Sequence, residues 1–119
     1  MESPSMLKYK VVLVPFPFDD LSSTKMRPAL CLTRALGLHG HVVLAFITSR
    51  VPQNLLPTDL VIDTNDPHAA TTGLHVSSTL QLHRLMTVTS RLIRRELGTL
   101  SPVLQTQVEH RLRGLFGLT

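Results

Sequence analysis

The chain has 119 residues, 43% of them hydrophobic and 17% charged, which suits a single folded domain and excludes a disordered chain. Lysine and arginine total 12 against 8 acidic residues, a net charge of +4, so an anionic partner such as nucleic acid or an acidic protein segment is favoured. No apolar run approaches the roughly 18 residues of a membrane helix, and residues 1–10 lack the pattern of a signal peptide; we expect a cytoplasmic protein with no membrane partner.

Short apolar segments predict strands in the first third of the chain. Residues 10–18 (KVVLVPFPF) are rich in valine and phenylalanine. Pro15 and Pro17 place the end of this strand at an edge or a bulge, because proline cannot donate a hydrogen bond to a neighbouring strand. Residues 19–26 form a polar loop, and residues 28–33 (PALCLT) are the second predicted strand.

Further strands are predicted along the middle of the chain. Residues 41–48 (HVVLAFIT) are apolar enough to be buried on both faces of a sheet. Residues 59–63 (DLVID) alternate and predict a short strand, and residues 74–82 and 85–89 indicate two more. Residues 91–97 (RLIRREL) are ambiguous, because their composition suits a helix and their position suits a strand.

The last segment is a predicted helix. Ser101 supplies an N-cap hydroxyl and Pro102 suits the first helical position. Apolar residues then recur every three or four positions, which gives the helix one apolar face. About seven short strands and one helix predict a mainly β (α+β) fold, a small bent barrel or packed sheet, as one domain over residues 1–119. A parallel α/β fold is disfavoured, because no helix separates the early strands.

Motifs for metal or cofactor chemistry are missing from the sequence. His39 and His41 lie close together, but Gly37 and Gly40 mark a turn, and no cysteine or acidic neighbour completes a zinc site. There is no phosphate-binding glycine loop, zinc-protease motif, Cys-x-x-Cys pair or Gly-x-Ser-x-Gly elbow. We expect no metal and no cofactor. The single cysteine, Cys31, lies in an apolar stretch and is predicted to be a buried structural thiol.

Arg27 is the charged residue with the most specific setting. Pro28 biases it toward an extended backbone, and its guanidinium is a rigid fork of N–H donors that suits phosphate oxygens. On these grounds alone, a solvated charge at a strand end is the favoured interpretation of Arg27. Thr48, Ser49 and Arg50 end the third strand with two hydroxyls and a charge, which either line a pocket or cap the strand.

A second group of arginines follows later in the chain. Arg84, Arg91, Arg94 and Arg95 form the densest basic cluster. They make either a solvated face or an electrostatic attraction for a polyanion. Aromatic residues are only 4% of the chain, so broad stacking of bases on aromatic rings is not expected.

The order of these segments resembles the MazF/PemK (Kid) toxins of type II toxin–antitoxin pairs. VVLVPFPFDDLSSTKMRPALCLT resembles the family's first strand, loop and Arg-Pro strand, and AFITSR resembles its third strand. TGLHVSS followed by LHRLMTVTSRLIRRELGTLSP resembles its last strands and terminal helix. The resemblance covers nearly the whole chain and favours a strand for residues 91–97. It implies a small SH3-like barrel that forms a homodimer.

The resemblance also implies a function. Many such toxins are metal-independent endoribonucleases, or mRNA interferases, which cleave single-stranded RNA at short sequences and arrest translation and growth. A cognate antitoxin covers the RNA groove with an extended, often acidic segment. Two alternatives stay open for this chain: a gyrase poison related to the CcdB proteins, which share the barrel shape, and an RNA-binding module without chemistry.

Site residues follow from the same resemblance. It implies catalytic roles for Arg27 and Thr48, and a flexible rim over the substrate for residues 19–26. The residues that it suggests for RNA binding are Ser22, Ser23, Lys25, Ser49, Arg50, Gln81 and Arg84.

The sequence departs from the family pattern at two places. Tyr9-Lys10 stands where members commonly have Gly-Asp, and Gln81-Leu82-His83 stands where some members carry an arginine and, two residues on, an acidic residue. The missing carboxylate would be the general base. Either His83 replaces it as a catalytic residue, since imidazole is suited to proton transfer near neutral pH, or the enzyme is weakened or inactive.

Overall fold

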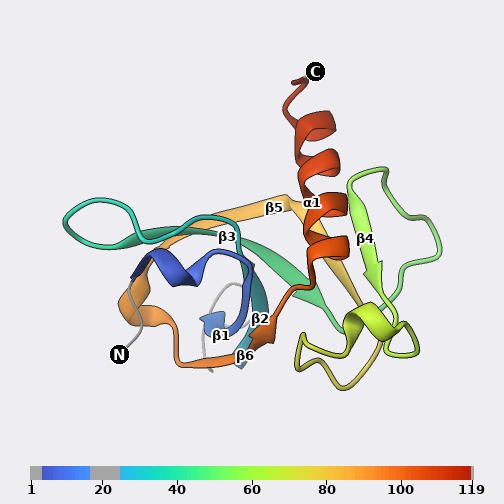
Figure 1. The fold of residues 1–119 in the computed structure, drawn as a ribbon, viewed down its shortest axis with the longest axis horizontal. Helices are drawn as coiled ribbons and strands as arrows, with labels where there is room; N and C mark the ends of the chain where they lie inside the picture. The colour runs from blue at the N-terminus through green and yellow to red at the C-terminus, as the bar shows by residue number, and fades with distance from the viewer. Residues whose placement is uncertain (1–3, 17–24, 119) are drawn as a thin grey trace.

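The computed structural model describes residues 4–16 and 25–118, which form one curled sheet and a C-terminal helix (Figure 1). The strands pair antiparallel in the order β4-β5-β3-β2-β1-β6. Their bounds are β1 Lys10–Phe16, β2 Lys25–Cys31, β3 His41–Thr48, β4 Asp59–Ile62, β5 Ser78–Thr89 and β6 Arg95–Thr99. Helix α1 spans Pro102–Leu115, and short 3-10 turns lie at η1 Pro4–Leu7, η2 Pro67–Ala69 and η3 Ser90–Leu92. The predicted mainly β fold with a closing helix is confirmed.

Strand β5 unites two segments that the sequence predicted as separate strands. Its register against β3 shifts, so that Ala45 lies opposite Leu85 while Phe46 lies opposite Gln81. Residues 82–84 therefore have no partner opposite them on β3. Such a bulge bends a strand, which explains why the sequence pattern breaks there. The described residues form a 6-stranded sheet, one strand fewer than predicted.

Two further strand boundaries differ from the prediction. Strand β2 begins at Lys25 rather than Pro28, because Lys25 and Met26 pair with the end of β1; these two residues do not belong to the loop. The predicted strand over residues 91–97 is half right, since η3 occupies Ser90–Leu92 and β6 begins at Arg95.

The edge predicted from Pro15 is confirmed. Strand β6 pairs only with residues 10–13 of β1, with a register shift between Val11 and Val12. Pro15 therefore lies opposite Met26 of β2 and beyond the residues that pair with β6, where a missing N–H costs no ladder hydrogen bond. Pro17 lies outside the described residues.

Side chains of the sheet form two buried clusters on opposite faces. One includes Val11, Leu30 and Ala45 and packs against Leu104 and Val108 of α1. The other contains their chain neighbours, Val12, Ala29, Cys31 and Leu44 among them. Because successive side chains of a strand point to opposite faces, a strand residue can be assigned to a face from the cluster of its neighbours.

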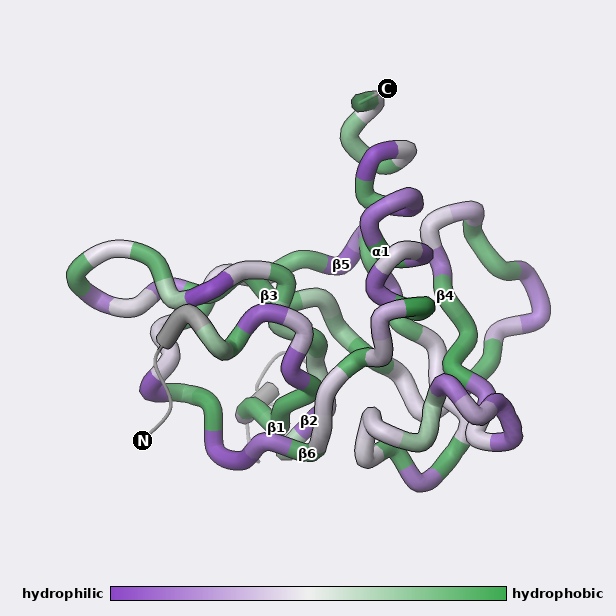
Figure 2. Tube along the Cα trace, viewed as in Figure 1, coloured by the Kyte–Doolittle hydropathy of each residue, from purple (hydrophilic) through white to green (hydrophobic). Residues whose placement is uncertain are grey.

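Helix α1 begins as predicted. The hydroxyl of Ser101 accepts a hydrogen bond from the Leu104 amide, and Pro102 occupies the first turn. Polar and apolar residues alternate along the helix (Figure 2), and Leu104 and Val108 are buried, which confirms the single apolar face. Among residues 4–16 and 25–118, no helix is long and apolar enough to cross a membrane.

Cys31 is a buried thiol, as predicted. Its side chain has no exposed surface, and burial raises the pKa of Cys31 to about 12. A thiol that stays protonated at neutral pH is a poor nucleophile, so Cys31 has a packing role in the second cluster.

Candidate functional site

A hollow of about 290 Å³ lies between the start of β2, the end of β3 and the middle of β5, and most of the predicted site residues line it. Its lining consists of Arg27, Phe46, Ile47, Thr48, Arg50, Gln81 and Arg84. All of these except Phe46 and Ile47 were predicted as catalytic or RNA-binding residues.

The register places the side chains of Arg27, Phe46 and Gln81 on the sheet face opposite α1, whereas Ile47 belongs to the cluster that packs against the helix. The side chains of Arg27, Ala29 and Cys31 point to the same face of β2, because these residues are two positions apart. Ala29 and Cys31 belong to the second cluster. Gln81 lies between Leu80 and Leu82, which point into the first cluster with α1, so its own side chain points to the other face. Phe46 lies opposite Gln81 and shares that face. The helix therefore leaves the hollow open.

Arg27 is held in an extended strand. It lies opposite Val14 in the β1–β2 ladder and is half-buried. Pro28 follows it within the same strand, so its backbone direction is fixed on both sides. A guanidinium whose backbone is fixed loses less freedom when it binds a ligand, because the ligand does not have to order the chain.

The end of β3 is anchored from β5. Thr48, the last residue of β3, is half-buried and lies opposite Thr79. The buried Thr79 hydroxyl donates a hydrogen bond of 2.8 Å to the carbonyl oxygen of Arg50. This bond fixes the segment that carries Thr48, Ser49 and Arg50. The role of Thr79 could not be predicted from the sequence, because it depends on the pairing of two strands that are distant in the chain.

Arg84 is oriented by its neighbours in the hollow. Its guanidinium lies over the ring of Phe46 at 5.4 Å from the ring centroid, a cation–π contact. Its Nη1 also donates a hydrogen bond of 3.3 Å to Oε1 of Gln81. The bulge at residues 82–84 makes this possible, because it removes Arg84 from the regular ladder. Phe46 was another residue that sequence analysis missed, since its strand reads simply as apolar.

The charged side chains among the described lining residues are all arginines: Arg27, Arg50 and Arg84. Together with the neutral Thr48 hydroxyl and Gln81 amide, these guanidinium groups line the hollow with hydrogen-bond donors and give it a positive charge. Guanidinium groups bind phosphate oxygens through paired hydrogen bonds. The hollow is therefore suited to a phosphate-containing ligand.

The match to known proteins gives the family. Residues 8–116 match the model of the PemK-like, MazF-like toxins of type II toxin–antitoxin systems. The chain belongs to this family. No curated protein matches the sequence.

Solved structures of similar fold agree with this assignment. The Mycobacterium tuberculosis toxin MazF-mt6 superposes with a TM-score of 0.70 at 23% identity, over 92% of this chain and 98% of that chain. MazE-MazF from Deinococcus radiodurans gives 0.70 at 21% identity, over 94% and 96%. An endoribonuclease in complex with its cognate antitoxin, from a mycobacterial species, gives 0.70 at 17% identity, over 95% and 96%. The toxin described here thus shares its fold with these proteins.

Several predicted residues of the toxin lie outside the hollow. Lys25 is exposed at the start of β2, opposite Phe16, and Ser49 is exposed beside Thr48; neither is among the lining residues. Ser22, Ser23 and the rest of the loop over residues 17–24 lie outside the described residues.

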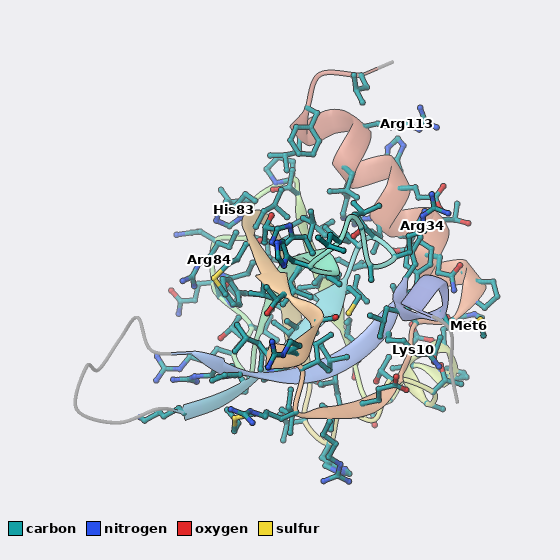
Figure 3. The ribbon with its side chains drawn as sticks, turned by 90° about the vertical axis from the view of Figure 1, so that its left-hand side faces the viewer. Met6, Lys10, Arg34, His83, Arg84 and Arg113 are labelled. Atoms are coloured by element: carbon teal, nitrogen blue, oxygen red, sulfur yellow. The ribbon has the colours of Figure 1, made fainter. Side chains whose placement is uncertain are left out.

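His83 also lies outside the lining, although Gln81 and Arg84 on either side of it belong to the hollow. His83 and Arg84 lie next to one another along β5 (Figure 3). The Nδ1 atom of His83 is 3.8 Å from Oδ1 of Asp59, a buried carboxylate on β4. This contact of Asp59 could not be predicted from the sequence, because it depends on the register of β4 against β5.

The other candidates have local explanations. Gly37 and Gly40 have left-handed backbones, with φ of 73° and 63°, which confirms the predicted turn around His39. In the described part of the toxin, no group of three or more His, Cys, Asp or Glu side chains could hold a metal ion. Of the basic cluster, Arg84 reaches the hollow, whereas Arg91, Arg94 and Arg95 are not among its lining residues.

Proposed function

We propose that this PemK/MazF-like toxin is an endoribonuclease that cleaves single-stranded RNA in the arginine-lined hollow, without a metal ion. The observation that carries the proposal is the convergence of Arg27, Arg50 and Arg84 with the Thr48 hydroxyl on one hollow. RNA brings one phosphate anion per nucleotide, and the hollow offers the donors that such a group requires.

The proposed reaction uses the ribose itself as the nucleophile. The 2′-hydroxyl loses its proton and its oxygen bonds to the adjacent phosphorus, while the bond from phosphorus to the 5′-oxygen breaks. The departing oxygen takes a proton from water. The products are a 2′,3′-cyclic phosphate and a 5′-hydroxyl. Negative charge builds up on the nonbridging oxygens during this step, and fixed cations and donors stabilise it.

Arg27 and Thr48 have distinct roles in this mechanism. The Arg27 fork holds the nonbridging oxygens, and the Thr48 hydroxyl donates a hydrogen bond to the same phosphate. Arg27 is a poor candidate for proton donation, because a guanidinium gives up its proton so reluctantly. Its contribution is therefore electrostatic, and it acts on the transition state more than on the bound substrate.

The neighbouring side chains suit binding of the adjacent nucleotides. Arg50 and Arg84 attract the RNA backbone, and Gln81 offers both a donor and an acceptor to a base edge. Lys25 and Ser49 would extend the contacts beyond the hollow. Selection of a short RNA sequence, and through it the arrest of translation and growth, belongs to this proposal.

The proposed partners are a cognate antitoxin and a second copy of the toxin. Two of the similar structures contain an antitoxin or MazE alongside the toxin. An extended acidic segment would complement the three arginines of the hollow and compete with RNA for them. Displacement of bound RNA by such a segment would show that both use the same surface.

The test is cleavage of a long single-stranded RNA by purified variants in the presence of EDTA. Arg27→Ala and Thr48→Ala should each lower the cleavage rate by about 100-fold or more, because each removes a donor aimed at the developing charge. Arg34→Ala is the matched control: Arg34 is exposed and lies on the opposite side of the view from Arg84 (Figure 3). It should cleave at the wild-type rate.

Two outcomes would contradict the proposal. Wild-type cleavage by Arg27→Ala or Thr48→Ala would show that the site is elsewhere. Salt-sensitive binding of RNA without any cleavage by the wild-type toxin would favour an RNA-binding module. Unchanged thermal unfolding of the variants would show that lost activity is not lost folding.

A further inference from the structure

Asp59 is a buried carboxylate, and one of its two oxygens accepts no hydrogen bond from the described residues. Its side chain is only 3% exposed. Its Oδ2 accepts a hydrogen bond of 2.9 Å from the Leu56 amide. Its Oδ1 is buried and has no hydrogen-bond partner among the described residues. A buried acceptor without a partner costs stability, so the position of Oδ1 calls for an explanation.

The backbone around Asp59 is fixed from two directions. Asp59 lies opposite Gln81 in the β4–β5 ladder, and Nε of Arg111 on α1 donates a hydrogen bond of 3.1 Å to its carbonyl oxygen. Leu60 and Ile62, its neighbours on β4, point into the cluster under α1. Asp59 therefore points to the other face of the sheet, the face that carries Gln81 and the hollow.

The imidazole of His83 lies near Oδ1 of Asp59. Its Nδ1 lies 3.8 Å from Oδ1 of Asp59, and a movement of roughly 1 Å would form a hydrogen bond. Catalytic hydrogen bonds are often longer before the substrate is bound. The His83 side chain is 36% exposed, so solvent and substrate can reach the imidazole. Two positive neighbours of the pair are Arg84, the next residue along β5, and Arg111, which donates to the Asp59 carbonyl.

We propose that Asp59 is a positioning residue for His83, and that the two form the proton-accepting pair of the RNA-cleavage site. This inference rests on the proposed function. The Asp59 carboxylate accepts the Nδ1 proton of His83 and thereby leaves Nε2 as the basic nitrogen. The carboxylate that the sequence lacks near residue 83 is then supplied by β4.

The pair fits the reaction without further reagents. Nε2 of His83 takes the proton of the 2′-hydroxyl as the oxygen bonds to phosphorus, and Asp59 stabilises the imidazolium that forms. The bond to the 5′-oxygen breaks, that oxygen takes a proton from water, and the imidazolium returns its proton to the solvent. Burial of Asp59 strengthens its interaction with the imidazolium, because water screens it less.

A first experiment uses Asp59→Asn, which keeps an oxygen for the Leu56 amide and removes the charge. We expect kcat for RNA cleavage to fall by about tenfold or more with KM nearly unchanged, because the interaction is made in the transition state. His83→Gln should lower kcat by about 100-fold, and Asp59→Asn should have little further effect in that background.

Asp63→Asn is the matched control. Asp63 follows the end of β4, is exposed, and accepts a backbone hydrogen bond from Asn65 much as Asp59 accepts one from Leu56. It should cleave at the wild-type rate. If Asp59→Asn lowers thermal stability but leaves kcat unchanged, the pair only stabilises the bulge of β5 and the proposal is wrong.

Two measurements leave Asp59 in place, in case its variant does not fold. Added imidazole should restore cleavage to His83→Ala, and failure to do so would overturn the role of His83. In the wild-type toxin, nitrogen NMR should find the neutral His83 ring protonated at Nδ1, whereas protonation at Nε2 would overturn the role of Asp59.

These results separate the inference from the proposed function. If the wild-type toxin cleaves RNA and depends on Arg27, but His83→Gln cleaves at the full rate, only the Asp59–His83 pair is refuted. If the wild-type toxin does not cleave RNA, the proposed function is refuted and the inference with it.

Discussion

Tyr9 adopts a backbone conformation that most residues avoid. Its φ is 69°, a left-handed value that glycine reaches at little cost. A glycine, as in the family pattern that the chain resembles, would adopt this conformation at little cost. The structure compensates with backbone hydrogen bonds: the Tyr9 amide donates to the Cys31 carbonyl at 2.7 Å, and the Leu100 amide donates to the Tyr9 carbonyl at 2.9 Å. The Tyr9 hydroxyl also donates to the Glu109 carboxylate of α1.

The bond between Tyr9 and Glu109 should contribute measurably to stability. Burial and the carboxylate of Glu109 raise the pKa of Tyr9 well above its usual value, so the phenol stays a donor at neutral pH. Tyr9→Phe keeps the ring and removes the donor, and should lower the free energy of unfolding by about 1 kcal/mol in denaturant titrations. In a Glu109→Ala background the same substitution should cost almost nothing; an equal cost in both backgrounds would show that the bond does not contribute.

Residue-level patterns predicted the local backbone setting of Arg27 and Thr48, whereas the family resemblance suggested that the two residues share a site. Arg27 owes its extended backbone to the adjacent proline, and Thr48 lies at the end of an apolar strand that the sequence delimits correctly. Asp59 and Thr79 could not be found this way, because their partners, His83 and the Arg50 carbonyl, lie on segments far away in the chain.

Among the helices and strands, β5 differs most from the prediction, because it is one strand where the sequence predicted two. The bulge at residues 82–84 interrupts the alternation of apolar and polar residues, so one bent strand was predicted as two. The bounds of β3 and the N-cap of α1 depend on local sequence and were predicted correctly. Register and bulges depend on which strands pair and how they are aligned. The local sequence of one strand does not determine this alignment.

The contact between β6 and the loop before β5 depends on a close backbone approach. A Cβ atom on Gly98 would lie 2.2 Å from the Thr71 carbonyl oxygen. Gly98→Ala should therefore lower the free energy of unfolding by about 2 kcal/mol or more, because backbone must move. The control is Gly114→Ala in α1, where the Cβ meets nothing within 4 Å; it should raise stability by a few tenths to about 1 kcal/mol. Equal effects of both substitutions, read from thermal unfolding, would contradict this packing.

Over the whole molecule, the net charge of +4 attracts RNA without regard to position. The hollow, in contrast, holds three arginines close together. Binding of single-stranded RNA to the Thr48→Ala variant, which we expect to cleave far more slowly, should weaken as salt rises. Each phosphate contact contributes about 0.7 to the slope of log K against log salt. Arg84→Gln should therefore reduce the slope by about 0.7, while Arg34→Gln leaves it unchanged; the reverse result would place the RNA on another face.

The proposed reaction is cleavage of RNA in the hollow by attack of the ribose 2′-hydroxyl. The most direct test is to treat a long single-stranded RNA with the wild-type toxin in EDTA and to identify the ends of the fragments. The proposed reaction leaves 2′,3′-cyclic phosphate and 5′-hydroxyl ends, so we expect fragments that carry them. Intact RNA, or fragments with 3′-hydroxyl and 5′-phosphate ends, would contradict it.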